Sequence, residues 1–204
     1  MKKADKILKK KKFIKREMER QLGRRLSDEI WESARERLEG YLKEYEDLPE
    51  GVHLHADNYI FPSSAIYLSA REKTDQAAAY RIVENSASWL TDRVGGLLRG
   101  ILLIPGFNSL FIRMMKGICQ KMYGKDNGFE NIYYSDSRDE FKMDIVSCPF
   151  CRYFTKLGCP ELTKIFCEND DRVYGRLTEI EFRRTSTLGK GNDRCDFRFR
   201  RKRS

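Results

Sequence analysis

Helical periodicity dominates the first part of the chain. Apolar residues recur every three or four positions up to about residue 123, which predicts a series of amphipathic helices. Ser27 is a suitable N-cap because Asp28 and Glu29 follow it in the first turn. Gly95 and Gly96 are expected to end a later helix. The expected helices cover residues 27–45, 62–70, 74–94 and 109–123.

The hydrophobic period changes to two in the last third of the chain. Phe141, Met143 and Ile145 alternate with more polar neighbours, which predicts a strand. Two further strands are expected over 179–187 and 194–200, joined by the turn residues of a hairpin at 189–193. Short helices are expected between the first strand and this hairpin, over 150–157 and 160–174. The predicted fold is α+β, with a helical N-terminal half packed on a small antiparallel sheet that ends in a C-terminal hairpin.

The positive charge of the chain is confined to its N-terminus. The net charge is +9, and residues 1–25 hold twelve Lys or Arg against three Asp or Glu, while the remaining chain holds 28 of each sign. Apolar residues at helical spacing between the lysines predict an amphipathic basic helix. Such an arm either packs its apolar stripe on the domain or contacts an acidic partner, RNA or an anionic surface. The neutral body disfavours a nucleic-acid-binding domain.

The composition predicts a cytoplasmic protein. No apolar segment of signal-peptide length follows the basic N-terminus. The longest apolar run, over 94–115, is interrupted by glycine, proline and arginine, so no transmembrane segment is expected. In that compartment the six cysteines are expected to serve as thiols, metal ligands or a nucleophile rather than as disulfides.

Five of the six cysteines lie in the segment 148–199. Cys148 and Cys151 form a CxxC motif without a second copy, and the spacing of the other three is irregular. A zinc ion or an iron–sulfur cluster is therefore a possible occupant rather than a required cofactor. Its candidate ligands are Cys148, Cys159, Cys167 and Cys195. His53 and His55, the only histidines, are expected on one side of an extended segment, where two ligands alone make no metal site.

The helix predicted over 160–174 carries a thiol and two carboxylates on one face. Cys167, Asp170 and Asp171 are three and four positions apart, so their side chains project together. Because neighbouring carboxylates repel each other, one of them can stay protonated near neutral pH and act as an acid or a base. The alternative is a solvated acidic face beside a core cysteine.

The predicted hairpin adds a second thiol and a cation. Alternation places Cys195 on the core side of its strand and Arg184 on the same side as the apolar residues of the neighbouring strand. A buried guanidinium needs a carboxylate partner. Asp170 or Asp171 would serve structurally, whereas a substrate carboxylate would serve functionally.

Several spaced motifs in this region resemble one enzyme family. They are Cys148-Pro149, Gly158-Cys159-Pro160-Glu161-Leu162, Phe166-Cys167 with Asp170-Asp171, Phe182-x-Arg184-Thr185-x-Thr187, and Gly191 followed by Cys195-Asp196-Phe197. Together they resemble the L-2-amino-thiazoline-4-carboxylic acid hydrolase family over roughly residues 60–200. Cys151 and the lysine-rich arm lie outside the pattern. We therefore divide the chain into a basic helical arm, 1–26, and a single α+β hydrolase-like domain, 27–204.

The resemblance implies hydrolysis of a small cyclic amidine that bears a carboxylate, with a carbamoyl-cysteine-type product. This chemistry needs a nucleophile, a proton donor for the leaving nitrogen and a cation for the carboxylate. The expected nucleophile is Cys167 or Cys195, the acid–base is Asp170 or Asp171, and the cation is Arg184. Thr185, Asn192 and Asp196 are expected to orient substrate or water. The alternatives are a cysteine-ligated metal or iron–sulfur sensor and a non-catalytic module that binds a small ligand.

Overall fold

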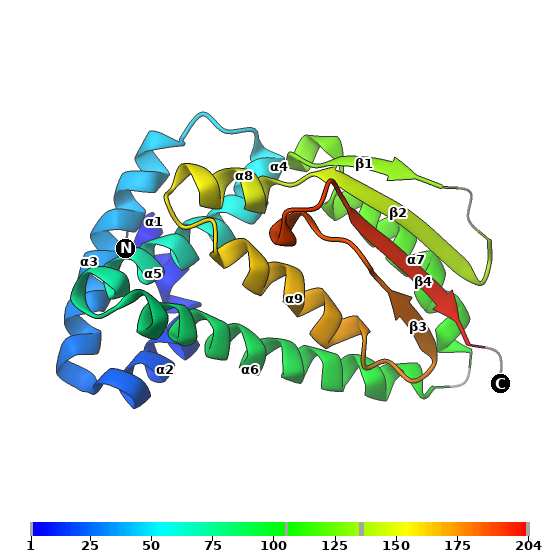
Figure 1. Cartoon of the computed structure of the whole chain (residues 1–204), viewed down its shortest axis with the longest axis horizontal. Coiled ribbons are helices and arrows are strands. Elements are labelled where there is room, and N and C mark those ends of the chain that lie inside the picture. Colours follow the sequence, from blue (N-terminus) through cyan, green and yellow to red (C-terminus); the bar gives the residue numbers. More distant parts are fainter. Residues whose placement is uncertain (1, 105, 135–136, 203–204) are drawn as a thin grey trace.

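The computed structural model describes residues 2–104, 106–134 and 137–202. Helices form the first 127 residues, apart from short connections. They are α1 (Lys3–Lys9), α2 (Lys12–Leu22), α3 (Arg24–Glu44), α4 (Glu50–His55), the π-helical turn η1 (Ala56–Ile60), α5 (Phe61–Lys73), α6 (Gln76–Leu102), α7 (Phe107–Met122) and the 3-10 turn η2 (Lys125–Asn127). The long helix α6 runs lengthwise along both the helical half and the sheet half (Figure 1). The α+β prediction is confirmed.

Three predicted helix boundaries are wrong. The third helix begins at Arg24 rather than at Ser27, whose hydroxyl donates instead to the Gly23 carbonyl within the first turn. The helix expected from Pro160 begins at Leu162. The helix expected to end at Gly95 continues to Leu102. Gly95 is buried against Val173, and a Cβ placed on it would lie 3.5 Å from the Val173 Cα, at ordinary van der Waals contact. The helix therefore continues through this glycine within a packed region.

The sheet has four antiparallel strands in the order β1-β2-β4-β3. Their bounds are β1 (Glu130–Tyr133), β2 (Glu140–Ser147), β3 (Ile180–Arg183) and β4 (Cys195–Arg201). The C-terminal pair is confirmed, but β3 ends four residues before the predicted end, and η3 (Leu188–Lys190) lies in the connection. The short strand β1 was not predicted from the sequence. Helices α8 (Pro149–Lys156) and α9 (Leu162–Tyr174) connect β2 to β3.

Two apolar clusters form the core. One joins α3, α5, α6 and the arm, and the other fills the space between α7 and the sheet. The arm forms two helices rather than one, broken at Lys10 and Lys11, and it buries an apolar stripe in the first cluster that consists of Ala4, Leu8, Ile14 and Met18. Phe150 at the start of α8 packs against both clusters. None of the described helices is long and apolar enough to cross a membrane.

Candidate active site

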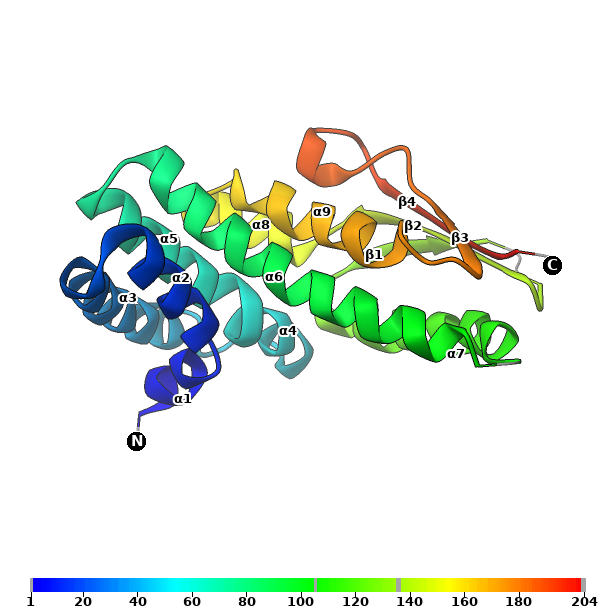
Figure 2. The same cartoon turned by 90° about the horizontal axis from the view of Figure 1, so that it is seen from below.

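A cavity of about 390 Å³ lies where the two apolar clusters meet. Helices α2, α6, α8 and α9 contribute to its wall, together with η1 and the inner face of β4. Figure 2 shows α9 next to α6, with the β3–β4 connection beyond α9. Charged and thiol side chains on the wall are Lys11, Cys148, Cys167, Asp170, Arg184 and Cys195. Most of the remaining wall is apolar or aromatic.

Cys167 of α9 and Cys195 of β4 form a pair of thiols on this wall. The Cys195 thiol donates a hydrogen bond that lowers the pKa of Cys167 to about 6, and the Thr187 hydroxyl and the Gly189 amide add to the effect against the cost of burial. The same bond, together with burial, raises the pKa of Cys195. Cys195 is therefore the protonated member of the pair. Because the thiolate is the reactive form of cysteine, Cys167 is the better nucleophile near neutral pH.

The connection between β3 and β4 closes tightly over the Cys167 thiol. A Cβ placed on Gly189 would lie 2.7 Å from the Cys167 Sγ and 3.2 Å from the Thr163 Cγ2. The backbone can approach the sulfur only because residue 189 has no side chain. Leu188 donates its backbone N–H to the Cys195 Sγ at 3.3 Å. Both sulfurs are thus held by backbone groups of η3.

Arg184 follows β3 and is buried, with 2% of its side chain exposed. Its Nη1 contacts the Asp170 Oδ2 at 3.0 Å, and its Nη2 contacts the Asp171 Oδ2 at 2.6 Å. Nη2 also donates to the Cys167 carbonyl at 2.6 Å. The guanidinium packs over the Phe197 ring, 5.3 Å from its centroid. Arg184 therefore holds α9 against the sheet and is occupied by two carboxylates of its own chain.

Asp170 is the carboxyl group of the cavity. Burial raises its pKa to about 7, the Arg184 guanidinium opposes this shift, and the Cys167 and Asp171 charges add to it. About 29% of its side chain stays accessible, and Asp170 lines the cavity. Asp171 does not line the cavity, and 45% of its side chain is exposed. Asp170 can thus exchange a proton with a ligand at neutral pH.

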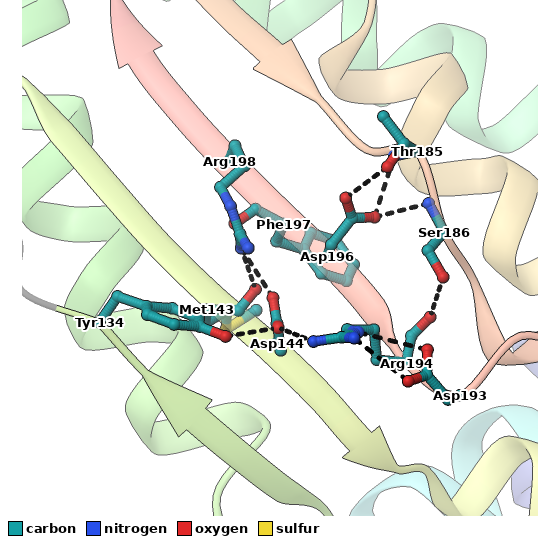
Figure 3. A network of polar contacts seen from close by, with 10 residues as sticks. All are labelled: Tyr134, Met143, Asp144, Thr185, Ser186, Asp193, Arg194, Asp196, Phe197 and Arg198. Carbon is teal, nitrogen blue, oxygen red and sulfur yellow. Dashed lines mark hydrogen bonds and ion pairs between the residues drawn. The ribbon is translucent and has the colours of Figure 1, made fainter.

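The residues expected to orient the substrate lie elsewhere. Asp196 accepts hydrogen bonds from the Thr185 and Ser186 amides and from the Thr185 hydroxyl, all on the outer face of the sheet (Figure 3). Asn192 donates to the Thr187 carbonyl at 3.3 Å. None of Thr185, Asn192 and Asp196 lines the cavity. The alternation of β4 explains this, because a strand that points Cys195 inward points Asp196 outward.

The four candidate metal ligands are not brought together. Cys167 pairs with Cys195, Cys148 is hydrogen-bonded to Cys151, and the Cys159 thiol donates to the Ser64 hydroxyl at 3.3 Å. Within 2–104, 106–134 and 137–202, no group of three or more His, Cys, Asp or Glu is placed to hold a metal ion. All six cysteines are free thiols.

The two histidines lie on helix α4, so the extended segment predicted for them is wrong. His53 contacts the Asp57 Oδ1 at 3.2 Å, while His55 is buried and lines the cavity. The His55 Nε2 donates to the Met122 carbonyl at 2.8 Å, which identifies Nδ1 as the unprotonated nitrogen. Burial lowers the pKa of His55, so the ring is neutral. In the sequence, His55 was considered as a metal ligand, and its place on the cavity wall was not predicted.

Three cavity residues come from the arm, which the sequence analysis placed outside the domain. Lys11, Phe13 and Ile14 line the cavity, and Phe13 stacks on Trp89 of α6 with 5.9 Å between ring centroids. The only signal for this contact in the sequence is the apolar spacing of the arm. That spacing shows that a helix face is buried but does not show what covers it.

Comparison with known proteins supports the expected family. A family model described as L-2-amino-thiazoline-4-carboxylic acid hydrolase matches residues 54–199. The matched segment includes Cys167, Asp170, Arg184 and Cys195 and excludes the arm. Searches of curated proteins and of solved structures find no match. Since the match spans well over half of the sequence, the chain belongs to the L-2-amino-thiazoline-4-carboxylic acid hydrolase family.

Proposed function

We propose that this protein hydrolyses a small cyclic amidine that carries a carboxylate, of the 2-amino-thiazoline-4-carboxylate type, to a carbamoyl-cysteine-type product. The observation that supports this proposal is that Cys167 and Asp170 line the same cavity. The first is a thiol with a pKa of about 6, and the second is a carboxyl group with a pKa of about 7. A nucleophile and an acid are thus available in the same pH range.

Ring opening begins at the amidine carbon, which is bonded to sulfur and to two nitrogens. The Cys167 thiolate forms a bond to this carbon and moves the electron pair of the C=N bond onto the ring nitrogen. Asp170 donates its proton to that nitrogen. The bond between carbon and ring nitrogen then breaks as the exocyclic amino group forms a C=N bond to the carbon and passes one of its protons to the leaving nitrogen. The products of this step are a free amine and an enzyme thioimidate that still carries the substrate sulfur.

Water completes the reaction. The Asp170 carboxylate accepts one proton from water as the water oxygen adds to the thioimidate carbon and the C=N electron pair moves onto the nitrogen. That nitrogen takes the remaining proton of the added hydroxyl as the C=O bond forms and the bond to Cys167 breaks. The proton held by Cys195 stabilises the departing Cys167 thiolate through the hydrogen bond between the two thiols. One water is consumed, the carbamoyl group stays on the substrate sulfur, and Cys167 and Asp170 return to their starting states.

The first test is turnover by the Cys167→Ser variant. We expect the wild-type protein to convert 2-amino-thiazoline-4-carboxylate to S-carbamoyl-cysteine, followed by mass spectrometry, with kcat/KM highest between about pH 6 and 7, where Cys167 is ionised and Asp170 still holds a proton. Cys167→Ser should lower kcat at least about 100-fold, since serine is not ionised in this range. Cys159→Ser is the control, because this buried thiol lies outside the cavity wall.

The competing possibility is a module that binds the ring compound without opening it. Calorimetric binding of the thiazoline with no product would establish that role instead. Equal turnover by wild-type protein and Cys167→Ser would exclude the thiolate mechanism and leave a water molecule activated by Asp170 as the attacking group.

A further inference from the structure

Arg184 is poorly placed to bind a substrate carboxylate. Its two terminal nitrogens already contact Asp170, Asp171 and the Cys167 carbonyl. A substrate carboxylate would have to displace one of these partners and would meet the remaining aspartate charges. Among the residues that line the cavity, the other lysine or arginine is Lys11 of the arm.

Lys11 is half-buried and, among the described residues, has no acidic partner. The neighbouring Lys10 and Lys12 also lack an ion pair there, but both are exposed to solvent. Lys3 pairs with Asp57 at 2.8 Å and Lys15 with Asp28 at 2.6 Å, whereas no carboxylate of the described chain lies within ion-pair distance of Lys11. The Lys11 Nζ lies 5.0 Å from the centroid of the Tyr59 ring instead. Burial, followed by the charge of Lys10, lowers the pKa of Lys11. An ammonium group held at an apolar wall without an anion is a binding position for an anionic ligand.

The cavity is larger than a thiazoline carboxylate requires. Its volume of about 390 Å³ falls in the range of sites for drug-sized ligands, whereas the thiazoline is comparable to a single amino acid. Helix α2, which begins directly after Lys11, lines the cavity with apolar side chains, and α6 contributes further apolar side chains. The apolar residues contributed by these two helices are Phe13, Ile14, Val83, Ala87, Leu90 and Val94. A ligand that fills the cavity must therefore carry an apolar body.

We propose that Lys11 binds the carboxylate of the natural substrate and that the apolar wall of α2 and α6 holds an apolar substituent absent from 2-amino-thiazoline-4-carboxylate. The arm, which lies outside the matched segment, then determines which substrate the cavity accepts. This inference rests on the proposed function for the reacting ring, but the binding of an apolar carboxylate does not depend on turnover. The substrate class is thus a cyclic amidine with one carboxylate and an aliphatic or aromatic substituent.

The test uses phenylbutyrate, a carboxylate with an aromatic body and no reacting ring, and its uncharged counterpart phenylbutanol. Both are titrated into the full chain by isothermal calorimetry. We expect phenylbutyrate to bind, and Lys11→Met to weaken its binding about tenfold, which corresponds to the loss of one charge-assisted contact worth about 1.4 kcal/mol. Binding of phenylbutanol should be the same in both proteins. Lys10→Met is the matched control, because Lys10 is exposed and does not line the cavity.

Lys11→Arg provides a second variant that keeps the charge, and it should bind phenylbutyrate within about threefold of wild type. The proposal is overturned if phenylbutyrate fails to bind to the wild-type protein or if Lys11→Met and Lys10→Met bind it equally. It is also overturned if Lys11→Met weakens phenylbutanol as much as phenylbutyrate. Absence of thiazoline turnover would instead count against the proposed function, since no reaction is needed for this measurement.

Discussion

The two faces of strand β4 carry two polar clusters that differ in chemical state. The inner cluster consists of Cys167, Cys195, Asp170, Asp171 and Arg184 and adjoins the cavity. On the outer face, Asp144 of β2 contacts three side chains, as shown in Figure 3. Those partners are the Arg198 Nη1 at 2.8 Å, the Arg194 Nη1 at 3.3 Å and the Tyr134 hydroxyl at 2.7 Å.

The ratio of cations to carboxylates distinguishes the two clusters. Burial raises the pKa of Asp144, but the Tyr134 hydroxyl and the two arginines outweigh burial, so the pKa lies below its usual range. In the inner cluster, one guanidinium serves two aspartates beside a thiolate, and the pKa of Asp170 is raised to about 7. Asp144, which contacts two arginines, has a lowered pKa and serves as a structural anion. Asp170, which shares Arg184 with Asp171, has a pKa of about 7 and can exchange protons. The raised pKa of Asp170 therefore supports the inner face as the place of the proposed reaction.

Replacement of Arg184 should produce the largest effect. Arg184→Met leaves Asp170 and Asp171 without their cation, and we expect a loss of about 3 kcal/mol in the free energy of unfolding at pH 8. This loss of stability is at the lower end of the range for buried ion pairs because the side chains of Asp170 and Asp171 are both partly exposed to solvent. The loss should shrink at pH 5, where Asp170 is protonated. Urea unfolding at both pH values measures it.

Arg183→Met is the control for that experiment. Arg183 is the preceding residue, and it pairs with Glu181 on the surface with 71% of its side chain exposed. Little change in stability is expected from its loss. Equal destabilisation by the two variants would show that the inner ion pairs contribute no more than a surface pair.

Replacement of Asp144 should have an intermediate effect. Asp144→Asn leaves two arginines without their shared anion, and we expect a loss of about 2 kcal/mol at pH 7. Asp144 itself is buried, with 1% of its side chain exposed. The expected loss is nevertheless smaller than for Arg184 because Arg194 and Arg198 are partly exposed and can be hydrated once the anion is gone. Thiazoline turnover should not change. A large fall in kcat without a change in stability would contradict the structural role of the outer cluster.

The pH dependence of stability in the Asp144 variant tests whether the outer carboxylate is ionised in the folded state. A carboxyl group whose pKa is lower in the folded state stabilises the protein above its unfolded pKa, about 3.9, and this contribution disappears as the pH falls through the folded value. Wild type and Asp144→Asn should therefore converge in stability below about pH 4. Asp193→Asn, which changes an exposed partner of Arg194, is the control and should follow wild type.

Replacement of Asp170 should have the smallest effect and the opposite sign. Its pKa is higher in the folded state than the unfolded value of about 3.9, so wild-type stability is fully present below about pH 4 and declines as the pH rises through about 7. Asp170→Asn removes this decline. Because one contact to Arg184 is also weakened, we expect a net gain of only about 1 kcal/mol at pH 8 and none at pH 5. Urea unfolding at the two pH values would reveal a loss at pH 8 if Asp170 were a structural anion.

Local patterns in the sequence predicted the parts of the site that depend on one element. The spacing of three and four placed Cys167, Asp170 and Asp171 together on a helix, and alternation placed Cys195 and Arg184 toward the core. The same alternation assigns Asp196 to the outer face, so its expected contact with substrate conflicted with the pattern of its own strand. Helix ends were less predictable, since Gly95 and Gly96 favour a helix end locally, but α6 continues through them while it packs on α9.

The amino-acid sequence was enough to predict the α+β class, the C-terminal strand pair and the family. It also brought forward two candidate thiols and two candidate acids, because these predictions depend on residues close in the chain. Only the tertiary structure decided how Arg184 divides its contacts, which thiol is ionised and which residues line the cavity. Lys11, His55 and Cys167 are far apart in sequence and reach one cavity only when the arm, α4 and α9 pack together. Proton affinity and cavity shape depend on such distant neighbours, and periodicity carries no information about them.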